Sequence, residues 1–201
     1  GLMIRTYSHD EVLELAHYAD MPIINGLTDL LHPCQALADI QTARQYKGTL
    51  SGLKLTFIGD GNNVAHSLMN ICAKMGMHFS IACPKGHEPQ ETIVKNAQEV
   101  AKRTNGSITI LEEPKEAIQN ADVVYTDVWA SMGQEKEAEE RKKVFQKYHV
   151  DCELMSYAKK DAIVMHCLPA KRGLEITDEV IESKQSVVFE EAENRLWAQM
   201  A

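Results

Sequence analysis

A histidine and a cysteine stand side by side at the end of an apolar run, in the segment VMHCLPAKRG at 164–173. An imidazole beside a thiol could act as a nucleophilic pair, supply two metal ligands, or be a structural histidine next to a buried cysteine. A nucleophilic pair must face each other, whereas consecutive strand residues such as His166 and Cys167 point to opposite sides. A zinc site needs about four ligands, and His32 with Cys34 is the nearest other candidate pair. Neither pattern is met, so the role of the segment depends on which residues share its end of the strand.

A glycine- and asparagine-rich turn, GDGNN at 59–63, lies between an expected strand and an expected helix. A dinucleotide-binding fingerprint would occupy this position, but Val64 replaces its third glycine, and the next strand ends in Ala-Cys-Pro instead of an acidic residue. We therefore do not expect nicotinamide binding. The turn still lies at the carboxyl edge of the sheet, where open α/β folds bind ligands. The amides of Asn62 and Asn63 favour a carboxylate or phosphate there, although Asn62 could also be a simple N-cap.

A carboxylate follows another expected strand, in the segment DVWASMG at 127–133. Asp127 with the Ser131 hydroxyl and the loop amides would suit the amino group of a ligand. The alternative is that Asp127 caps a helix and that Trp129 packs in the core.

Two further groups lie near helix starts. The sequence His-Pro-Cys-Gln opens a helix with a proline in its first turn, which is favourable there. This places His32 and Gln35 near one face of the helix, about one turn apart. Arg195 follows the last expected strand; taken alone, such an arginine is more often a surface charge.

Short β-branched runs alternate with longer helical stretches and must position these residues. Strands are expected at Met3–Tyr7, Lys54–Gly59, His78–Cys83, Ser107–Leu111, Val123–Val128, Ala162–Cys167 and Ser186–Phe189. Helices are expected near 9–18, 32–47, 62–75, 89–104, 114–120, 135–148 and 177–183. Many of the strands are mostly apolar, as in strands that are buried on both faces. The alternation predicts an α/β fold with a parallel sheet between two layers of helices.

A turn-rich break at 49–53 predicts a domain boundary near residue 48. The segment 32–47 would be the linking helix, and the roughly thirty residues before it are too few to form a domain alone. The charged segment EKEAEERKKVFQKY is expected to be a solvated helix or the edge of a lid.

Composition narrows the class of protein. The chain has 201 residues, of which 44% are hydrophobic and 25% charged, as in ordinary globular proteins. Its formal net charge is -8 without a basic cluster, which disfavours nucleic acid and anionic membranes as partners. Five scattered cysteines favour reduced thiols and a cytoplasmic location. No apolar run approaches the roughly 18 residues of a membrane helix, and the N-terminus lacks the layout of a signal peptide.

Five segments together resemble ornithine carbamoyltransferases. They are INGLTDLLHPCQALAD (24–39), FIGDGNNVAHSLM (57–69), DVWASMGQE (127–135), HCLPAKRG (166–173) and FEEAENRLW (189–197). With similar residues between them, the likeness covers essentially the whole chain. The H-P-x-Q segment is shared among transcarbamoylases, whereas D-x-W-x-S-M-G is typical of the ornithine enzymes and not of those for aspartate or putrescine. The resemblance implies a doubly wound parallel sheet forming a Rossmann-like, ornithine-binding domain, plus a remnant of a second α/β domain.

On this basis residues 1–48 would be the end of a carbamoyl phosphate-binding domain with the linking helix. Residues 49–190 would form the ornithine-binding domain, and residues 191–201 would begin a helix that returns to the first domain. The implied reaction is attack of the side-chain amine of L-ornithine on carbamoyl phosphate, giving L-citrulline and phosphate. The resemblance implies no metal or organic cofactor, and a homotrimer or a multiple of trimers. Another amine acceptor, or an amino-acid-binding module without turnover, remains the alternative.

The resemblance also assigns contacts with carbamoyl phosphate. His32 and Gln35 match the H-P-x-Q residues that polarise the carbamoyl carbonyl and fix its amide. Arg5 matches an arginine on the phosphate side of the substrate, and Arg195 matches one that reaches the carbamoyl oxygen. Cys167 and Leu168 match the loop that completes the carbamoyl phosphate contacts. The expected catalytic residues are His32, Gln35, Cys167 and Arg195.

Ornithine contacts are implied in the same way. Asn63 and Asp127 match the groups that bind the α-carboxylate and the α-amine, with help from Ser131 and Met132.

The resemblance also answers the question raised by the first segment. Cys167 would lie beside the reacting amine without forming a covalent intermediate, and Leu168 would offer its carbonyl to the carbamoyl amide. Pro169 would stiffen the turn, and His166 would be structural.

One diagnostic feature of the family is missing. A Ser-Thr-Arg-Thr-Arg turn cradles the phosphate in these enzymes, and nothing like it occurs in these 201 residues. We therefore expect a fragment that lacks most of the carbamoyl phosphate domain, makes no citrulline alone and retains weak ornithine binding.

Overall fold

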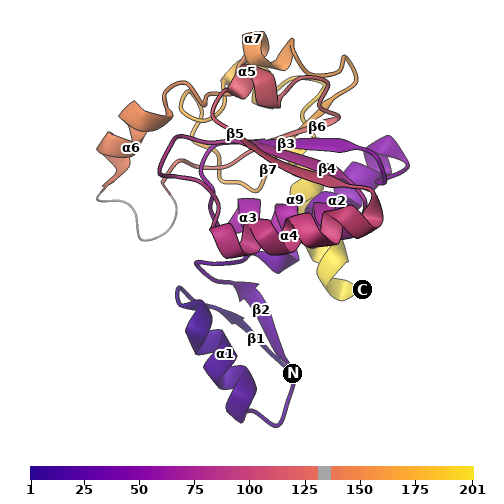
Figure 1. The fold of residues 1–201 in the computed structure, drawn as a ribbon, viewed down its shortest axis with the longest axis vertical. Coiled ribbons are helices and arrows are strands. Elements are labelled where there is room, and N and C mark those ends of the chain that lie inside the picture. Colours follow the sequence, from indigo (N-terminus) through magenta and orange to yellow (C-terminus); the bar gives the residue numbers. More distant parts are fainter. Residues whose placement is uncertain (131–136) are drawn as a thin grey trace.

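The fold is described by a computed structural model, over residues 1–130 and 137–201. Its main body is a five-stranded sheet in the order β5-β4-β3-β6-β7, with every neighbouring pair parallel (Figure 1). The strands are β3 (Lys54–Ile58), β4 (His78–Ala82), β5 (Ser107–Leu111), β6 (Val123–Thr126) and β7 (Ile163–His166). The strand order reverses at β3, which pairs with β4 on one side and β6 on the other. The loops after β3 and β6 therefore diverge, and this is where open α/β sheets bind ligands.

Helices cover both faces of the sheet (Figure 1). One face carries α2 (Pro33–Lys47), α3 (Asn63–Lys74), α4 (Glu91–Thr104) and α9 (Val188–Met200); the other carries α5 (Pro114–Ala117), α6 (Ala138–Phe145), α7 (Cys152–Met155) and α8 (Asp178–Ile181). Each face has its own apolar core. Phe57 and Tyr125 belong to the first core, and Ile58 and Val124 to the second, because successive strand residues face opposite ways. The doubly wound parallel sheet predicted from the alternation of elements is confirmed.

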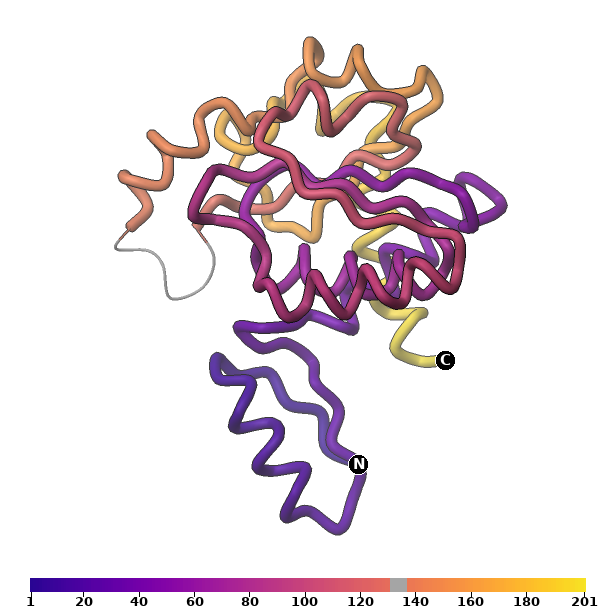
Figure 2. The backbone as a smooth tube through the Cα atoms, in the orientation of Figure 1, coloured from indigo at the N-terminus to yellow at the C-terminus, as the bar shows by residue number. Residues whose placement is uncertain are grey.

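The N-terminal part projects from this body (Figures 1 and 2). It consists of β1 (Leu2–Arg5), α1 (His9–Tyr18) and β2 (Ile23–Leu27), with the two strands parallel. Many of its apolar side chains are exposed, among them Met3 and Tyr18. A two-stranded sheet is marginally stable by itself, so this part depends on its contacts with the main body.

Three hydrogen bonds fasten the segment after β2 to the first turns of α3. The amide nitrogen of Asn63 donates to the Thr28 carbonyl at 2.7 Å, and His66 Nδ1 lies 2.9 Å from the Leu30 carbonyl. The backbone N–H of His32 donates to the Ser67 hydroxyl at 2.7 Å. These bonds fix the start of α2 beside the turn that follows β3.

The expected strand Ser186–Phe189 is wrong. Ser186 forms an isolated bridge with Val164, and α9 begins at Val188, earlier than the expected helix start at 191. Val187 and Val188 bury their side chains in the two different cores, so packing overrides the β propensity of this valine pair.

Two elements were not predicted, namely β2 and the short helix α7. The other expected strands are present, and the long helices agree with prediction to within a few residues. None of the helices in the described parts of the chain is long and apolar enough to cross a membrane.

Candidate functional site

A cleft of about 780 Å³ opens at the carboxyl ends of β3, β6 and β7. It is lined by every described residue that the sequence singled out as a ligand contact. These are Arg5, His32, Gln35, Asn63, Asp127, Cys167, Leu168 and Arg195. Ser131 and Met132 lie outside the described residues. Segments from both ends of the chain therefore line one cleft.

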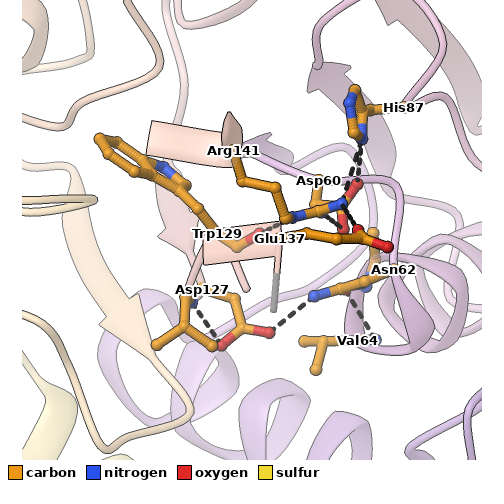
Figure 3. A network of polar contacts seen from close by, with 10 residues as sticks. Asp60, Asn62, Val64, His87, Asp127, Trp129, Glu137 and Arg141 are labelled. Atoms are coloured by element: carbon orange, nitrogen blue, oxygen red, sulfur yellow. Dashed lines mark hydrogen bonds and ion pairs between the residues drawn. The ribbon is translucent and has the colours of Figure 1, made fainter. Parts of the chain in front are cut away.

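Asp127 accepts hydrogen bonds from two side chains that line the cleft, and Figure 3 shows the one from Asn62. Its Oδ2 accepts from the side-chain amide of Asn62 at 2.8 Å, and its Oδ1 accepts from the thiol of Cys167 at 3.1 Å. The other end of the Asn62 side chain caps α3, since Oδ1 accepts from two backbone amides in the first turn. Asn62 is thus the N-cap of α3, and it also fixes the orientation of the Asp127 carboxylate. The sequence did not reveal this second role.

Cys167 is present as a thiol. Burial and the neighbouring Asp127 raise the pKa of Cys167 well above its usual value. A cysteine nucleophile needs the opposite environment, with a lowered pKa. Its neutral S–H group is instead a hydrogen-bond donor at the floor of the cleft.

His166 is hydrogen-bonded to partners other than Cys167, although one of its ring nitrogens lies within 4.8 Å of the Cys167 sulfur. Its Nε2 lies 3.2 Å from the buried Glu175 carboxylate, and its Nδ1 accepts from the Leu168 backbone at 2.9 Å. Leu168 has φ +52° and precedes a cis bond to Pro169. Leucine rarely adopts that backbone conformation, so His166 holds the turn in a shape that it would not otherwise prefer.

His32 lies on the opposite wall and is electrically neutral. Burial, then the nearby charges of Arg195 and Arg5, lower the pKa of His32 to about 3. Beside it, Gln35 accepts a hydrogen bond from Arg195 Nη1 through its side-chain oxygen at 2.5 Å. This wall therefore offers a neutral imidazole and a guanidinium to a ligand.

A second group of polar residues lies behind Gln35, away from the cleft. The amide nitrogen of Gln35 donates to the carboxyl groups of Asp39 and Glu191, both of which are buried. The sequence did not predict this cluster. The sequence feature that pointed to it is Asp39, an acidic residue within the otherwise apolar helix segment ALADI.

A buried ion pair joins α6 to the turn after β3 (Figure 3). Arg141 donates to Asp60 and to the backbone carbonyl of Trp129, and His87 lies 3.5 Å from Asp60. Burial raises the pKa of Asp60, while Arg141 and His87 lower it. The segment was expected to be a solvated helix or the edge of a lid; α6 is indeed a helix with most of its residues at least partly exposed, but it buries Arg141 and Phe145. Arg141 thereby ties α6 to Trp129, so it links the described chain on either side of residues 131–136.

Asp127, His166 and Cys167 could in principle hold a metal ion, since their donor atoms lie within 4.8 Å of one another. Each is already engaged in the hydrogen bonds given above. We therefore assign these three side chains no metal.

The chain matches two family models. Residues 51–201 match the Asp/Orn binding domain of aspartate/ornithine carbamoyltransferase, and residues 1–45 match the carbamoyl-P binding domain of the same family. Among curated proteins, it is 55% identical to an ornithine carbamoyltransferase of Thermococcus kodakarensis and 57% identical to one of Carboxydothermus hydrogenoformans. Both alignments cover 100% of this chain, and 64% and 65% of the respective relatives. The chain thus spans somewhat less than two thirds of the length of these relatives.

Solved structures give the same result. The ornithine carbamoyltransferase from Pyrococcus furiosus superposes with a TM-score of 0.95 at 54% identity, over 98% of this chain and 63% of that one. The ornithine transcarbamoylase from Giardia lamblia superposes with a TM-score of 0.92 at 34% identity, over 99% of this chain and 67% of that one. The resemblance inferred from the five segments is therefore confirmed, and the chain belongs to the aspartate/ornithine carbamoyltransferase family.

Proposed function

We propose that this chain carries the amino-acid side of an ornithine carbamoyltransferase site. The protein would transfer the carbamoyl group of carbamoyl phosphate to the side-chain amine of L-ornithine, giving L-citrulline and phosphate. One observation carries the proposal: every described residue to which the resemblance gives a role lines the same cleft. The names of the relatives at 53–57% identity favour ornithine over other acceptors.

The carbamoyl group would lie against His32, Gln35 and Arg195. Attack on its carbonyl carbon creates negative charge on oxygen, which the neutral imidazole and the guanidinium would stabilise as hydrogen-bond donors. Because the pKa of His32 is lowered to about 3, the ring does not compete as a base at neutral pH. Arg5, at the rim of the cleft, would face the phosphate. Loss of one donor of this kind typically costs ~10²–10³ in rate.

Ornithine would bind on the sheet side. Asp127 supplies a carboxylate for the α-amine, and Asn63 has a second amide N–H for the α-carboxylate beyond the one bound to Thr28. Cys167 would lie beside the reacting amine as a neutral thiol, so the chemistry needs no covalent cysteine intermediate. Leu168 would offer its carbonyl to the carbamoyl amide, while Ser131 and Met132 would complete the α-amino site.

The proposal includes a division of labour along the chain. Residues 1–48 belong to a carbamoyl phosphate domain, residues 49–190 bind ornithine, and residues 191–201 belong to the helix that returns to the first domain. The working protein would be a homotrimer or a multiple of trimers in the cytoplasm, with small-molecule substrates and no nucleic acid or membrane partner.

The test is an assay with three acceptors, L-ornithine, putrescine and L-aspartate, each with carbamoyl phosphate. The assayed protein must join these 201 residues to a segment with a Ser-Thr-Arg-Thr-Arg turn, and the 201-residue chain serves as the second sample. We expect citrulline from the joined protein and none from the chain alone. Preference for another acceptor would identify a different transcarbamoylase, and ornithine binding without turnover in the joined protein would identify a binding module.

A further inference from the structure

Two carboxyl groups are buried against one another beneath the cleft. Asp39 lies on α2 and Glu191 on α9, two helices that pack side by side although they are far apart in the sequence (Figure 1). Asp39 is 1% exposed and Glu191 is 0% exposed. Acidic residues are almost never so deeply buried unless they are paired, so this arrangement requires an explanation.

The hydrogen bonds around the pair all come from neutral donors. The side-chain nitrogen of Gln35 donates to Asp39 Oδ1 at 2.7 Å and to Glu191 Oε1 at 3.2 Å. Glu191 also accepts from the Tyr125 hydroxyl at 3.1 Å and from the backbone N–H of His166 at 2.9 Å. The Gln35 nitrogen has two N–H groups, and both are used on the carboxyl side.

Below about pH 7 the two carboxyl groups are not both ionised, because two negative charges buried this close together repel each other. Burial raises the pKa of Asp39 to about 7, and burial together with Asp39 raises the pKa of Glu191 well above its usual value. Both groups accept from the same Gln35 nitrogen, so their oxygens lie close together, and the second oxygen of Asp39 is buried without any other hydrogen-bond partner. A proton shared between the two groups would supply that partner and remove the repulsion between them. Arg195 carries a positive charge that slightly opposes the rise in the pKa of Asp39, but it hydrogen-bonds the opposite end of Gln35.

The other titratable groups that face the pair stay neutral at neutral pH. The pKa values of Tyr125 on β6, Cys167 after β7 and Cys72 on α3 are all raised by burial. Below about pH 7 the proton therefore stays on the pair itself.

We propose that Asp39 and Glu191 share one proton and act as positioning residues that hold the side-chain oxygen of Gln35 toward the cleft. Acceptors behind Gln35 attract its nitrogen, so its oxygen must face the opposite way, toward Arg195 and the ligand. The oxygen is then an acceptor for the N–H groups of a carbamoyl ligand. This last step rests on the proposed function, whereas the proton and the amide orientation do not.

The chain itself provides a discriminating pair of variants. In Asp39→Asn, the side-chain oxygen can still accept from Gln35 and the new N–H₂ group can donate to Glu191. The shared proton is thereby replaced by an amide hydrogen that does not titrate. In Asp39→Leu, the closer of the two acceptors for the Gln35 nitrogen is lost from a side chain of similar size, so only the 3.2 Å contact with Glu191 still holds the amide in its orientation. Glu190→Gln, at an exposed neighbour on α9, is the matched control.

The direct measurement is the pH dependence of the Gln35 side-chain amide resonances in the 201-residue chain, followed by NMR. We expect a step with a midpoint near pH 7 in the unaltered chain and in Glu190→Gln, and no step in Asp39→Asn. Asp39→Asn should keep resonances close to those of the unaltered chain, and Asp39→Leu should shift them. A step that persists in Asp39→Asn, or its absence from the unaltered chain, would overturn the proposal.

Turnover provides the second measurement, in the protein that joins the chain to a phosphate-binding turn. We expect Asp39→Leu to lower kcat/KM for carbamoyl phosphate by about 10- to 100-fold, and Asp39→Asn to stay within about threefold. Equal losses in both variants would refute the positioning role. If no citrulline forms with any variant, the proposed function fails while the NMR result still decides on the shared proton.

Discussion

Replacement of Asp127 by asparagine is the substitution that separates the two halves of the site most sharply. Asp127→Asn preserves the shape of the side chain and removes its charge. Both carboxylate oxygens of Asp127 accept hydrogen bonds from the protein, from Asn62 on one side and from Cys167 and the Val128 backbone on the other. The new N–H₂ group must therefore face a donor, whichever way it turns.

The size of the effect follows from these contacts. A hydrogen bond between a carboxylate and an ammonium group contributes about 1.5–3 kcal/mol, so its loss should weaken ornithine binding by about 10- to 150-fold. The conflict between donors should also lower the free energy of unfolding by about 1–3 kcal/mol. Carbamoyl phosphate affinity should change by less than about threefold, because most of its proposed contacts come from Arg5, His32, Gln35 and Arg195, on other elements than Asp127.

The assay is calorimetric titration of the 201-residue chain with L-ornithine, accompanied by KM measurements for both substrates in the joined protein. Asp20→Asn makes the same chemical change at an exposed position and controls for charge. Equal losses for the two substrates, or an unchanged ornithine affinity in Asp127→Asn, would refute the assignment of Asp127 to the amine.

Three other perturbations test the electrostatics. Arg141→Met leaves a buried carboxylate without its partner and should lower the free energy of unfolding in urea by about 3–5 kcal/mol; a loss below about 1 kcal/mol would contradict the buried ion pair. Iodoacetamide should modify the exposed Cys152 at least about tenfold faster than the half-buried Cys167 at neutral pH, because the pKa of Cys167 is raised well above its usual value. Mass spectrometry measures the two rates, and faster modification of Cys167 would contradict the prediction. The folded chain keeps a proton on Asp39 that the unfolded chain releases, so this stability is present below about pH 4 and should fall by about 4 kcal/mol as pH rises to about 7. Urea unfolding at several pH values measures this loss as the difference between the pH dependence of the unaltered chain and that of Asp39→Asn. The same pH dependence in both proteins would count against the prediction.

The strand ends could be predicted from the sequence because they depend on local patterns. Apolar runs followed by Gly, Asn, Asp or Cys mark the carboxyl ends of buried parallel strands, and those ends must share one edge of the sheet. The convergence of Asp127 and Cys167 follows from this rule, and their 3.1 Å contact agrees with it. The contact of Asn62 with Asp127 was missed because the amide of an N-cap residue has no sequence signal for its second partner.

The failures have a different physical origin. The pairing of Asp39 with Glu191 depends on the packing of α2 on α9, which no local pattern encodes. The ion pair of Arg141 with Asp60 could not be predicted, because the sequence of a charged helix does not show which of its cations reaches a buried acid. The valines at 187 and 188 favoured a strand, and only the positions of the two cores decide for a helix there.

The central claim is that ornithine binds in the cleft at the carboxyl ends of β3, β6 and β7. NMR titration of the 201-residue chain with L-ornithine tests this claim most directly, because it locates the ligand without any need for turnover. The account predicts the largest changes in backbone resonances at Asn63, Asp127 and Cys167, with little change at the separate pocket between Cys152 and Gln185. Changes centred on that other pocket, or equal responses to L-ornithine and L-aspartate, would contradict it.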